Sequence, residues 1–201
     1  MKFSVHRMDV IELEFIYRRI FRLMNWSKNA IRSLYQKVFV LTLILCSFAM
    51  KSQDLVGSTA YSLVLKGLLS KSVPHTGVAK LSESDVKKFV FLDARELKEY
   101  NVSHLRNALH VGYDSLDLSP VDSLDKATPI IVYCSVGYRS EKVTEKLIAK
   151  GFTNVKNLYG GLFEWVNQDG EIVNNENATT DSVHGFSPAW GFWLKKGNKT
   201  Y

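Results

Sequence analysis

Apolar and polar positions change period several times between residues 57 and 168. Continuous apolar runs such as "FVFL" and "PIIVY" are typical of strands buried on both faces of a parallel sheet, and segments with apolar residues three or four apart follow them. Strands that alternate with helices predict an α/β domain with a central parallel sheet flanked by helices. The strands are expected at 89–92, 107–113, 129–133 and 153–161, and the helices at 96–100, 139–150 and 162–168.

Two segments flank this pattern. Residues 57–70 place five apolar residues on one helical face, with Ser58 or Thr59 available as the N-cap, so residues 50–76 are predicted to form a lead helix and a linker. These five are Tyr61, Val64, Leu65, Leu68 and Leu69. The tail, residues 169–201, has no clear period. Its aromatic residues are expected to pack against the domain, and a binding surface is the alternative. These aromatic residues are Trp190, Phe192 and Trp193.

The formal charge of +6 is concentrated at the N-terminus. Residues 1–49 hold eight Lys and Arg against three Asp and Glu, which leaves eighteen against seventeen in residues 50–201. Because the main body is close to neutral, the charge gives no support for a nucleic-acid-binding face on it.

The N-terminal 49 residues have the layout of a signal peptide. The run "VFVLTLILCSFAM" at 38–50 carries no charge, follows basic residues, and has small residues at Ser47 and Ala49. Cleavage is expected after Ala49, with translation starting at Met24, and the protein is expected to be exported to a bacterial periplasm. An uncleaved membrane anchor is the alternative, although a spanning helix needs about 20 apolar residues.

Cleavage would remove Cys46 and leave Cys134, which follows the strand 129–133. Ligands of open parallel sheets bind at the carboxyl ends of strands, where helix N-termini present free amides. Gly137 permits a turn in the loop Ser135–Tyr138, whose amides and the next helix can stabilise a thiolate, and Arg139 adds a positive charge. A buried, inert cysteine is the alternative. No metal, nucleotide or flavin motif is found.

Three stretches resemble the rhodanese family in the order in which that family has them. "FLDARELKEYNVSHLRNALHV" is similar to its Asp and Arg-Glu segment, "IIVYCSVGYRS" to its active-site loop and "KNLYGGLFEW" to its closing Gly-Gly-x-x-x-Trp. The resemblance covers residues 77–168. It departs from the family pattern at Ser103 and Asn107, where the family usually has glycine.

The resemblance implies a sulfurtransferase. In rhodaneses the matching cysteine takes a sulfane sulfur from a donor, holds it as a persulfide and passes it to a nucleophilic acceptor, which assigns this role to Cys134. Residues Ser135, Val136, Gly137, Tyr138 and Arg139 are then the substrate-binding loop. The expected partners are a small sulfur donor and an acceptor, which could be a protein thiol, with no cofactor, no metal and no nucleic acid, and with a membrane only through the signal segment.

Two other functions remain open. Cysteine phosphatases and arsenate reductases use a similar loop, but with C-x5-R spacing, whereas Cys134 and Arg139 are separated by four residues. A persulfide carrier or binding module without fast turnover would keep the same residues.

Asp93 and His104 are expected to brace loops by hydrogen bonds rather than to act as acid or base. Arg95 and Glu96 are expected to form a surface or loop-bracing pair. Tyr138 either lines the pocket mouth or covers the helix.

The side chains of the loop bear on the choice of donor. Efficient use of thiosulfate in the family goes with basic residues just after the cysteine, whereas this chain has Ser135 and Val136 there, which leaves Arg139 to attract the dianion. Thiosulfate is therefore expected to be a poor donor compared with less charged persulfides or polysulfides.

Overall fold

The computed structural model describes residues 10–23, 35–42, 55–81 and 83–201. The chain divides into two units, residues 1–53 and 54–201. In the first unit, α1 spans Val10–Leu23 and residues 35–42 are also helical. The expected start at Met24 and cleavage after Ala49 fall outside the described residues. No helix within the described part is long and apolar enough to cross a membrane.

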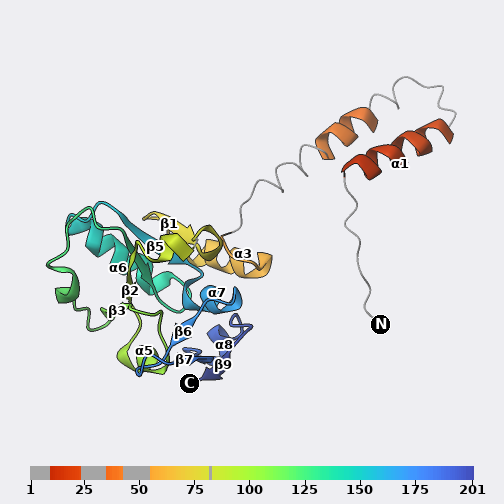
Figure 1. The fold of residues 1–201 in the computed structure, drawn as a ribbon. Helices are drawn as coiled ribbons and strands as arrows, with labels where there is room; N and C mark the ends of the chain where they lie inside the picture. Colours follow the sequence, from red (N-terminus) through yellow and green to blue (C-terminus); the bar gives the residue numbers. More distant parts are fainter. Residues whose placement is uncertain (1–9, 24–34, 43–54, 82) are drawn as a thin grey trace. The chain divides into compact units, whose positions relative to one another are not determined.

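The second unit is built on a five-stranded sheet (Figure 1). Its strands are β1 (His75–Gly77), β2 (Val90–Asp93), β3 (Leu109–His110), β4 (Ile130–Tyr133) and β5 (Val155–Tyr159). They lie in the order β1-β5-β4-β2-β3, and every pairing is parallel. The predicted α/β class with a parallel central sheet is confirmed.

The register of the sheet separates two hydrophobic cores. Phe91 pairs with Ile131 and the next residues, Leu92 and Val132, pair with each other, so successive residues of both strands face opposite sides. Ile131 belongs to the core beneath α3 (Thr59–Leu68) and α7 (Gly161–Asn167). Val132 belongs to the core beneath α6 (Tyr138–Ala149). Every residue of β4 is buried, because helices cover both faces of the sheet.

Several connections between the strands contain short helices. They are η1 (Val78–Lys80) and α4 (Glu83–Val86) after β1, α5 (Leu97–Val102) after β2, and η2 (Ser119–Val121) before β4. Helix α6 ends before Gly151, whose φ of +96° is that of a left-handed C-terminal glycine. Asn107 has φ +62°, a conformation that asparagine tolerates, so it can replace glycine in that turn.

The lead helix α3 begins as its sequence predicts. The Ser58 hydroxyl accepts a hydrogen bond from the Tyr61 amide, and the helix ends at Leu68, six residues before Pro74. Tyr61 and Leu65 are buried in the core, whereas Val64, which the sequence pattern places on the same face, is exposed. The Tyr61 hydroxyl donates to the Gly160 carbonyl at 3.0 Å, which attaches this helix to the N-terminus of α7.

The tail folds into small elements that the sequence pattern does not predict. They are β6 (Ile172–Val173), β7 (Thr179–Thr180), β8 (Ser182–His184), α8 (Pro188–Gly191) and β9 (Asn198–Thr200). Val183 and Leu194 are fully buried in the core beneath α3 and α7. Trp193 stacks on Tyr61 with ring centroids 5.2 Å apart. The tail and the lead helix therefore pack on the same side of the sheet, near α7 (Figure 1).

Candidate functional site

The carboxyl ends of β2 and β4 define a crevice. From β2 the chain moves to β3, toward one edge of the sheet, and from β4 it moves to β5, toward the opposite edge. Such a reversal of direction is where open α/β sheets bind their ligands. Cys134 is the first residue after β4, and the loop to α6 therefore lies in this crevice.

The Cys134 sulfur is surrounded by hydrogen-bond donors at the start of α6. The Gly137 amide donates to Sγ at 3.1 Å, and the Ser140 hydroxyl lies 3.5 Å from Sγ. Gly137 has φ +116°, a conformation that favours glycine, and this conformation directs its amide toward the sulfur. Cys134 is only 1% exposed, so the donors act in a poorly solvated space.

A buried polar chain runs from the sulfur into the sheet. The Ser140 hydroxyl donates to Asn157 Oδ1 at 2.7 Å, and Asn157 Nδ2 donates to the Gly137 carbonyl at 2.9 Å. This carbonyl can only accept, which fixes the orientation of the amide. Ser140 has a single proton for two acceptors, Asn157 Oδ1 and the sulfur. It can therefore accept from a thiol or turn its proton toward a thiolate.

His75, on the edge strand β1, extends this chain. Its Nδ1 lies 3.2 Å from Asn157 Nδ2, which has a proton to donate, so Nδ1 is the unprotonated nitrogen of the ring. Nε2 then carries the proton and faces Glu141 Oε1 at 3.4 Å. Burial lowers the pKa of His75 below its ordinary 6.5, although the nearby Glu141 raises it. The lowered pKa favours a neutral ring.

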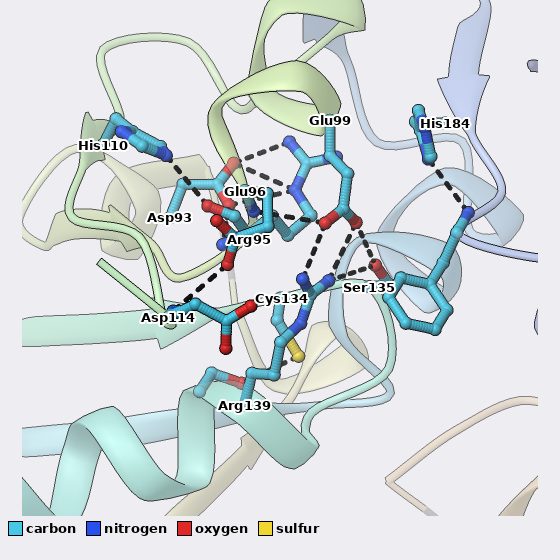
Figure 2. Close-up of polar contacts among 12 residues, drawn as sticks. Asp93, Arg95, Glu96, Glu99, His110, Asp114, Cys134, Ser135, Arg139 and His184 are labelled. Atoms are coloured by element: carbon cyan, nitrogen blue, oxygen red, sulfur yellow. Dashed lines mark hydrogen bonds and ion pairs between the residues drawn. The ribbon is translucent and has the colours of Figure 1, made fainter. Parts of the chain in front are cut away.

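Arg139 is held by a carboxylate from α5, the helix after β2 (Figure 2). Its Nη1 and Nη2 donate to the two carboxylate oxygens of Glu99 at 2.6 and 2.8 Å, and Nη2 also donates to Ser135 Oγ at 3.1 Å. Burial opposes the charged forms, but this pairing lowers the pKa of Glu99 and raises that of Arg139. The charge expected to attract an anion is thus already neutralised by Glu99.

The expected pair of Arg95 with Glu96 is wrong. Arg95 is fully buried and binds the Asp93 carboxylate, with Nη2 at 2.6 Å from Oδ2, and it also donates to the Ser103 carbonyl at 2.6 Å. The reason is that a buried guanidinium needs a partner that is also buried, and Asp93 is buried at the end of β2, the strand next to the central β4. Glu96 instead caps α5, where its side chain and that of Glu99 form a reciprocal capping box.

Asp93 and His104 brace loops, in line with the sequence interpretation. The Asp93 carboxylate accepts from the Arg95 amide at 2.9 Å as well as from its guanidinium. His104 Nδ1 lies 3.1 Å from the Tyr100 carbonyl, and its ring stacks on that of Tyr100. Neither side chain lines the pocket at Cys134.

The N-terminus of α7 donates hydrogen bonds to the backbone of the Cys134 loop. The Leu162 amide donates to the Cys134 carbonyl at 2.8 Å and the Phe163 amide to the Ser135 carbonyl at 3.1 Å. This approach is possible because position 161 is glycine. A Cβ there would lie 2.3 Å from the Cys134 carbonyl oxygen, and φ is +58°.

A pocket of about 160 Å³ opens over Cys134. The loop residues predicted from sequence mostly line it, and Gly137 contributes its amide to the sulfur instead. Tyr138 is 41% exposed, at the pocket mouth. The remaining wall consists of apolar side chains from the lead helix and the tail. The lining residues are Leu68, Cys134, Ser135, Val136, Tyr138, Arg139, Phe186 and Trp190.

Sequence reasoning missed several residues of this site. Glu99, His75 and Asn157 reach it through strand order and long-range pairing, which local spacing does not reveal. The Glu96 and Glu99 spacing is that of a capping box and could have indicated the start of α5.

A cysteine whose sulfur accepts from a loop amide at the end of the central strand of a parallel sheet defines a class of α/β domain, and the comparisons identify it. The rhodanese-like domain family matches residues 77–168. The thiosulfate sulfurtransferase GlpE of Coxiella burnetii is 31% identical over 98 residues, which cover 49% of this chain and 89% of that protein. The chain therefore belongs to the rhodanese-like family.

Two further matches cover a smaller share of the other protein. The tRNA uridine(34) hydroxylase of Pectobacterium carotovorum is 39% identical over 84 residues, which cover 39% of this chain and 24% of that enzyme. The solution structure of the rhodanese-like domain of an Anabaena protein is 28% identical with a TM-score of 0.42, covering 46% of this chain and 70% of that one. The relative named a thiosulfate sulfurtransferase supports an enzyme of sulfurtransferase type.

Proposed function

We propose that the protein transfers a sulfane sulfur through a persulfide on Cys134. The thiolate attacks the outer sulfur of a donor, forms the new S–S bond and releases the rest of the donor as a thiolate, sulfite or sulfinate. An external nucleophile then attacks the bound sulfur, and the Cys134 thiolate leaves. Charge and atoms balance in both steps without a redox partner.

The sulfur environment suits both anionic states of this cycle. The Gly137 amide, at 3.1 Å, can hydrogen-bond the thiolate, and α6 presents further amides of its first turn on the same side. Ser140 can direct its proton toward sulfur when negative charge develops, because its hydroxyl already lies 3.5 Å from Sγ. Fixed dipoles in a dry site stabilise charge without reorganisation.

The observation that carries the proposal is the position of Cys134. It is the cysteine found among the described residues, it lines the pocket, and its sulfur accepts from a loop amide at the end of the central strand. An inert structural thiol would need neither a pocket nor an amide donor.

The arrangement of Arg139 argues against a phosphatase. In that reaction an arginine binds two oxygens of a tetrahedral oxyanion beside the cysteine. Here both terminal nitrogens of Arg139 are bonded to Glu99, so the guanidinium is not available as a bidentate clamp. A carrier without fast turnover would retain persulfide formation and lack steady-state transfer, which separates it from an enzyme.

The test compares Cys134→Ser with Cys46→Ser, which alters the other cysteine of the chain. Sulfur transfer from a persulfide donor to a small thiol should be abolished in the first variant and unchanged in the second, with little change in the melting temperature of either. Transfer by Cys134→Ser within about tenfold of the wild type would contradict the proposal.

We also propose that the N-terminal segment directs export. The charge asymmetry of residues 1–49 and the apolar run at 38–50 support it. N-terminal sequencing of protein from its native compartment tests this, and Met50 is the expected first residue. An intact N-terminus on protein in the membrane fraction would support the anchor instead.

A further inference from the structure

The walls of the pocket over Cys134 come from two sources. Five of the eight lining residues lie within residues 77–168, the range that the family shares, and Leu68, Phe186 and Trp190 lie outside it. These three side chains are apolar, and they face the nucleophile from the lead helix and from the tail. The shared domain thus supplies the cysteine loop, and segments outside the matched range add a hydrophobic wall.

Contacts of residues that do not line the pocket hold this wall in place. Trp193 stacks on Tyr61 of α3, and the Asn167 side chain of α7 donates to the Trp193 carbonyl at 2.9 Å. The Ser187 hydroxyl caps α8 by accepting from the Trp190 amide at 3.4 Å. The lead helix, α7 and the tail are therefore joined, and the wall is preformed rather than assembled by a ligand.

Phe186 occupies an unusual backbone conformation at this wall. Five non-glycine residues of the described part have positive φ, and four of them are Lys, Asn or Asp. Phe186, with φ +63°, is the large apolar one among them. A bulky residue in the left-handed region is strained, and such strain is concentrated at functional sites. Its amide is bonded to His184 Nδ1 at 3.0 Å, and the Arg139 guanidinium lies 5.0 Å from its ring centroid.

The charge and the volume of the pocket define its ligand. Arg139, whose charge is paired with Glu99, is the cation among the lining residues, so a dianion gains little there. The volume is about 160 Å³, and an engineered apolar cavity of about 150 Å³ binds benzene. A single six-membered ring or an alkyl group of that size matches the space.

We propose that this pocket binds the organic group of an organosulfur donor, an aryl or branched alkyl persulfide or thiosulfonate, with its outer sulfur at Cys134. This assignment rests on the proposed persulfide function and names its donor class. For a persulfide, the thiolate of Cys134 forms a bond to the outer sulfur of R–S–SH, the S–S bond of the donor breaks, and the proton of the outer sulfur moves to the departing sulfur. The thiol R–SH leaves, and Cys134 holds a persulfide anion. For a thiosulfonate, the sulfinate leaves and charge is conserved.

Three probes differ in the group attached to the transferred sulfur: benzenethiosulfonate, methanethiosulfonate and thiosulfate. The rate at which Cys134 gains one sulfur is measured by mass spectrometry on the full chain. Each rate is divided by the rate of the same probe with free cysteine in solution, which removes intrinsic reactivity. The phenyl probe should exceed the methyl probe by about tenfold or more, because a ring is buried from water. Thiosulfate should be the slowest.

Variants of the wall test the assignment against a matched control. Phe186→Ala and Trp190→Ala should each lower the phenyl-to-methyl ratio by about fivefold. Phe192→Ala removes an aromatic ring that is 61% exposed and does not line the pocket, and it should leave the ratio unchanged. Phe186→Gly removes the ring and relieves the backbone at φ +63°, so its lowered ratio could not come from a failure to fold.

The outcomes separate this assignment from the proposed function. If all three probes load Cys134 in proportion to their reactivity in solution, the apolar subsite is refuted and the persulfide function stands. A ratio that is unchanged within about twofold in both Phe186→Ala and Trp190→Ala would refute the subsite as well. If no probe loads Cys134, the persulfide function itself fails.

Discussion

The shared domain and the segments that flank it contribute differently to one site. Residues 77–168 provide the sulfur, its amide donor and the paired Arg139, and these are held by buried polar contacts such as Ser140 with Asn157. The flanks provide Leu68, Phe186 and Trp190, which are apolar and partly exposed. Chemistry in the site depends on fixed hydrogen bonds, whereas the ligand it accepts depends on added hydrophobic surface. The comparison implies that the two can be altered separately.

The largest effect is expected from Gly161→Ala, on the domain side of the comparison. The added methyl would lie 2.3 Å from the Cys134 carbonyl oxygen at φ +58°, so both the backbone and the cysteine loop must shift. The free energy of unfolding should fall by about 3 kcal/mol, and persulfide formation should be lost. Urea unfolding and mass spectrometry measure the two effects.

Gly151→Ala is the control for this substitution. Gly151 also has positive φ, +96°, but no atom lies within 4 Å of an added Cβ. It should cost about 1 kcal/mol and leave persulfide formation intact. An equal loss of unfolding free energy at both positions would mean that the close contact between α7 and the cysteine loop does not contribute to stability.

On the flank side, Trp193→Ala should lower the free energy of unfolding by about 2 kcal/mol, because the ring stacked on Tyr61 is lost from a partly buried position. The melting temperature should fall by several degrees. Loading from methanethiosulfonate should change little, since Trp193 contacts neither the sulfur nor the loop. A much lower loading rate with an unchanged melting temperature would mean that the tail contributes to function rather than to stability.

Glu99→Gln tests whether pairing suppresses the charge of Arg139. The amide keeps the shape of the side chain and leaves the guanidinium uncompensated, so use of thiosulfate should improve by about tenfold, or about 1.4 kcal/mol, through a lower Michaelis constant. The gain should shrink as salt rises. Glu145→Gln, a partly exposed change of the same charge on α6, is the control. An unchanged Michaelis constant in Glu99→Gln would contradict the account.

The smallest effect concerns pH. Burial is the main cause that lowers the pKa of His75, His104 and His184 below 6.5. The unfolded chain then binds more protons below about pH 6.5, so the free energy of unfolding should fall as pH is lowered from about 7 to about 5. Carboxylates such as Glu99, whose pKa is lowered by Arg139 against the effect of burial, add to this loss only at lower pH. Stability that rises with acidification would contradict a neutral, buried state of these rings.

Sequence reasoning predicted the regular part of the molecule well. The continuous apolar runs predict the central strands, and the helix after Cys134 follows from its own periodicity, because both depend on neighbours along the chain. The predicted partner of Arg95, Glu96, was wrong. Arg95 is buried and pairs with Asp93, which is also buried. The pairing of Glu99 with Arg139 and the left-handed Phe186 depend on tertiary contacts, and no local pattern encodes them.

The most direct test of the central claim is mass spectrometry of the peptide that contains Cys134 after incubation of the full chain with an organic persulfide and removal of excess donor. The account predicts that this peptide gains one sulfur, that the sulfur is lost on addition of a small thiol, and that Cys46→Ser behaves identically. A Cys134 that stays unmodified while donor is consumed, or a sulfur found on another residue, would contradict the account.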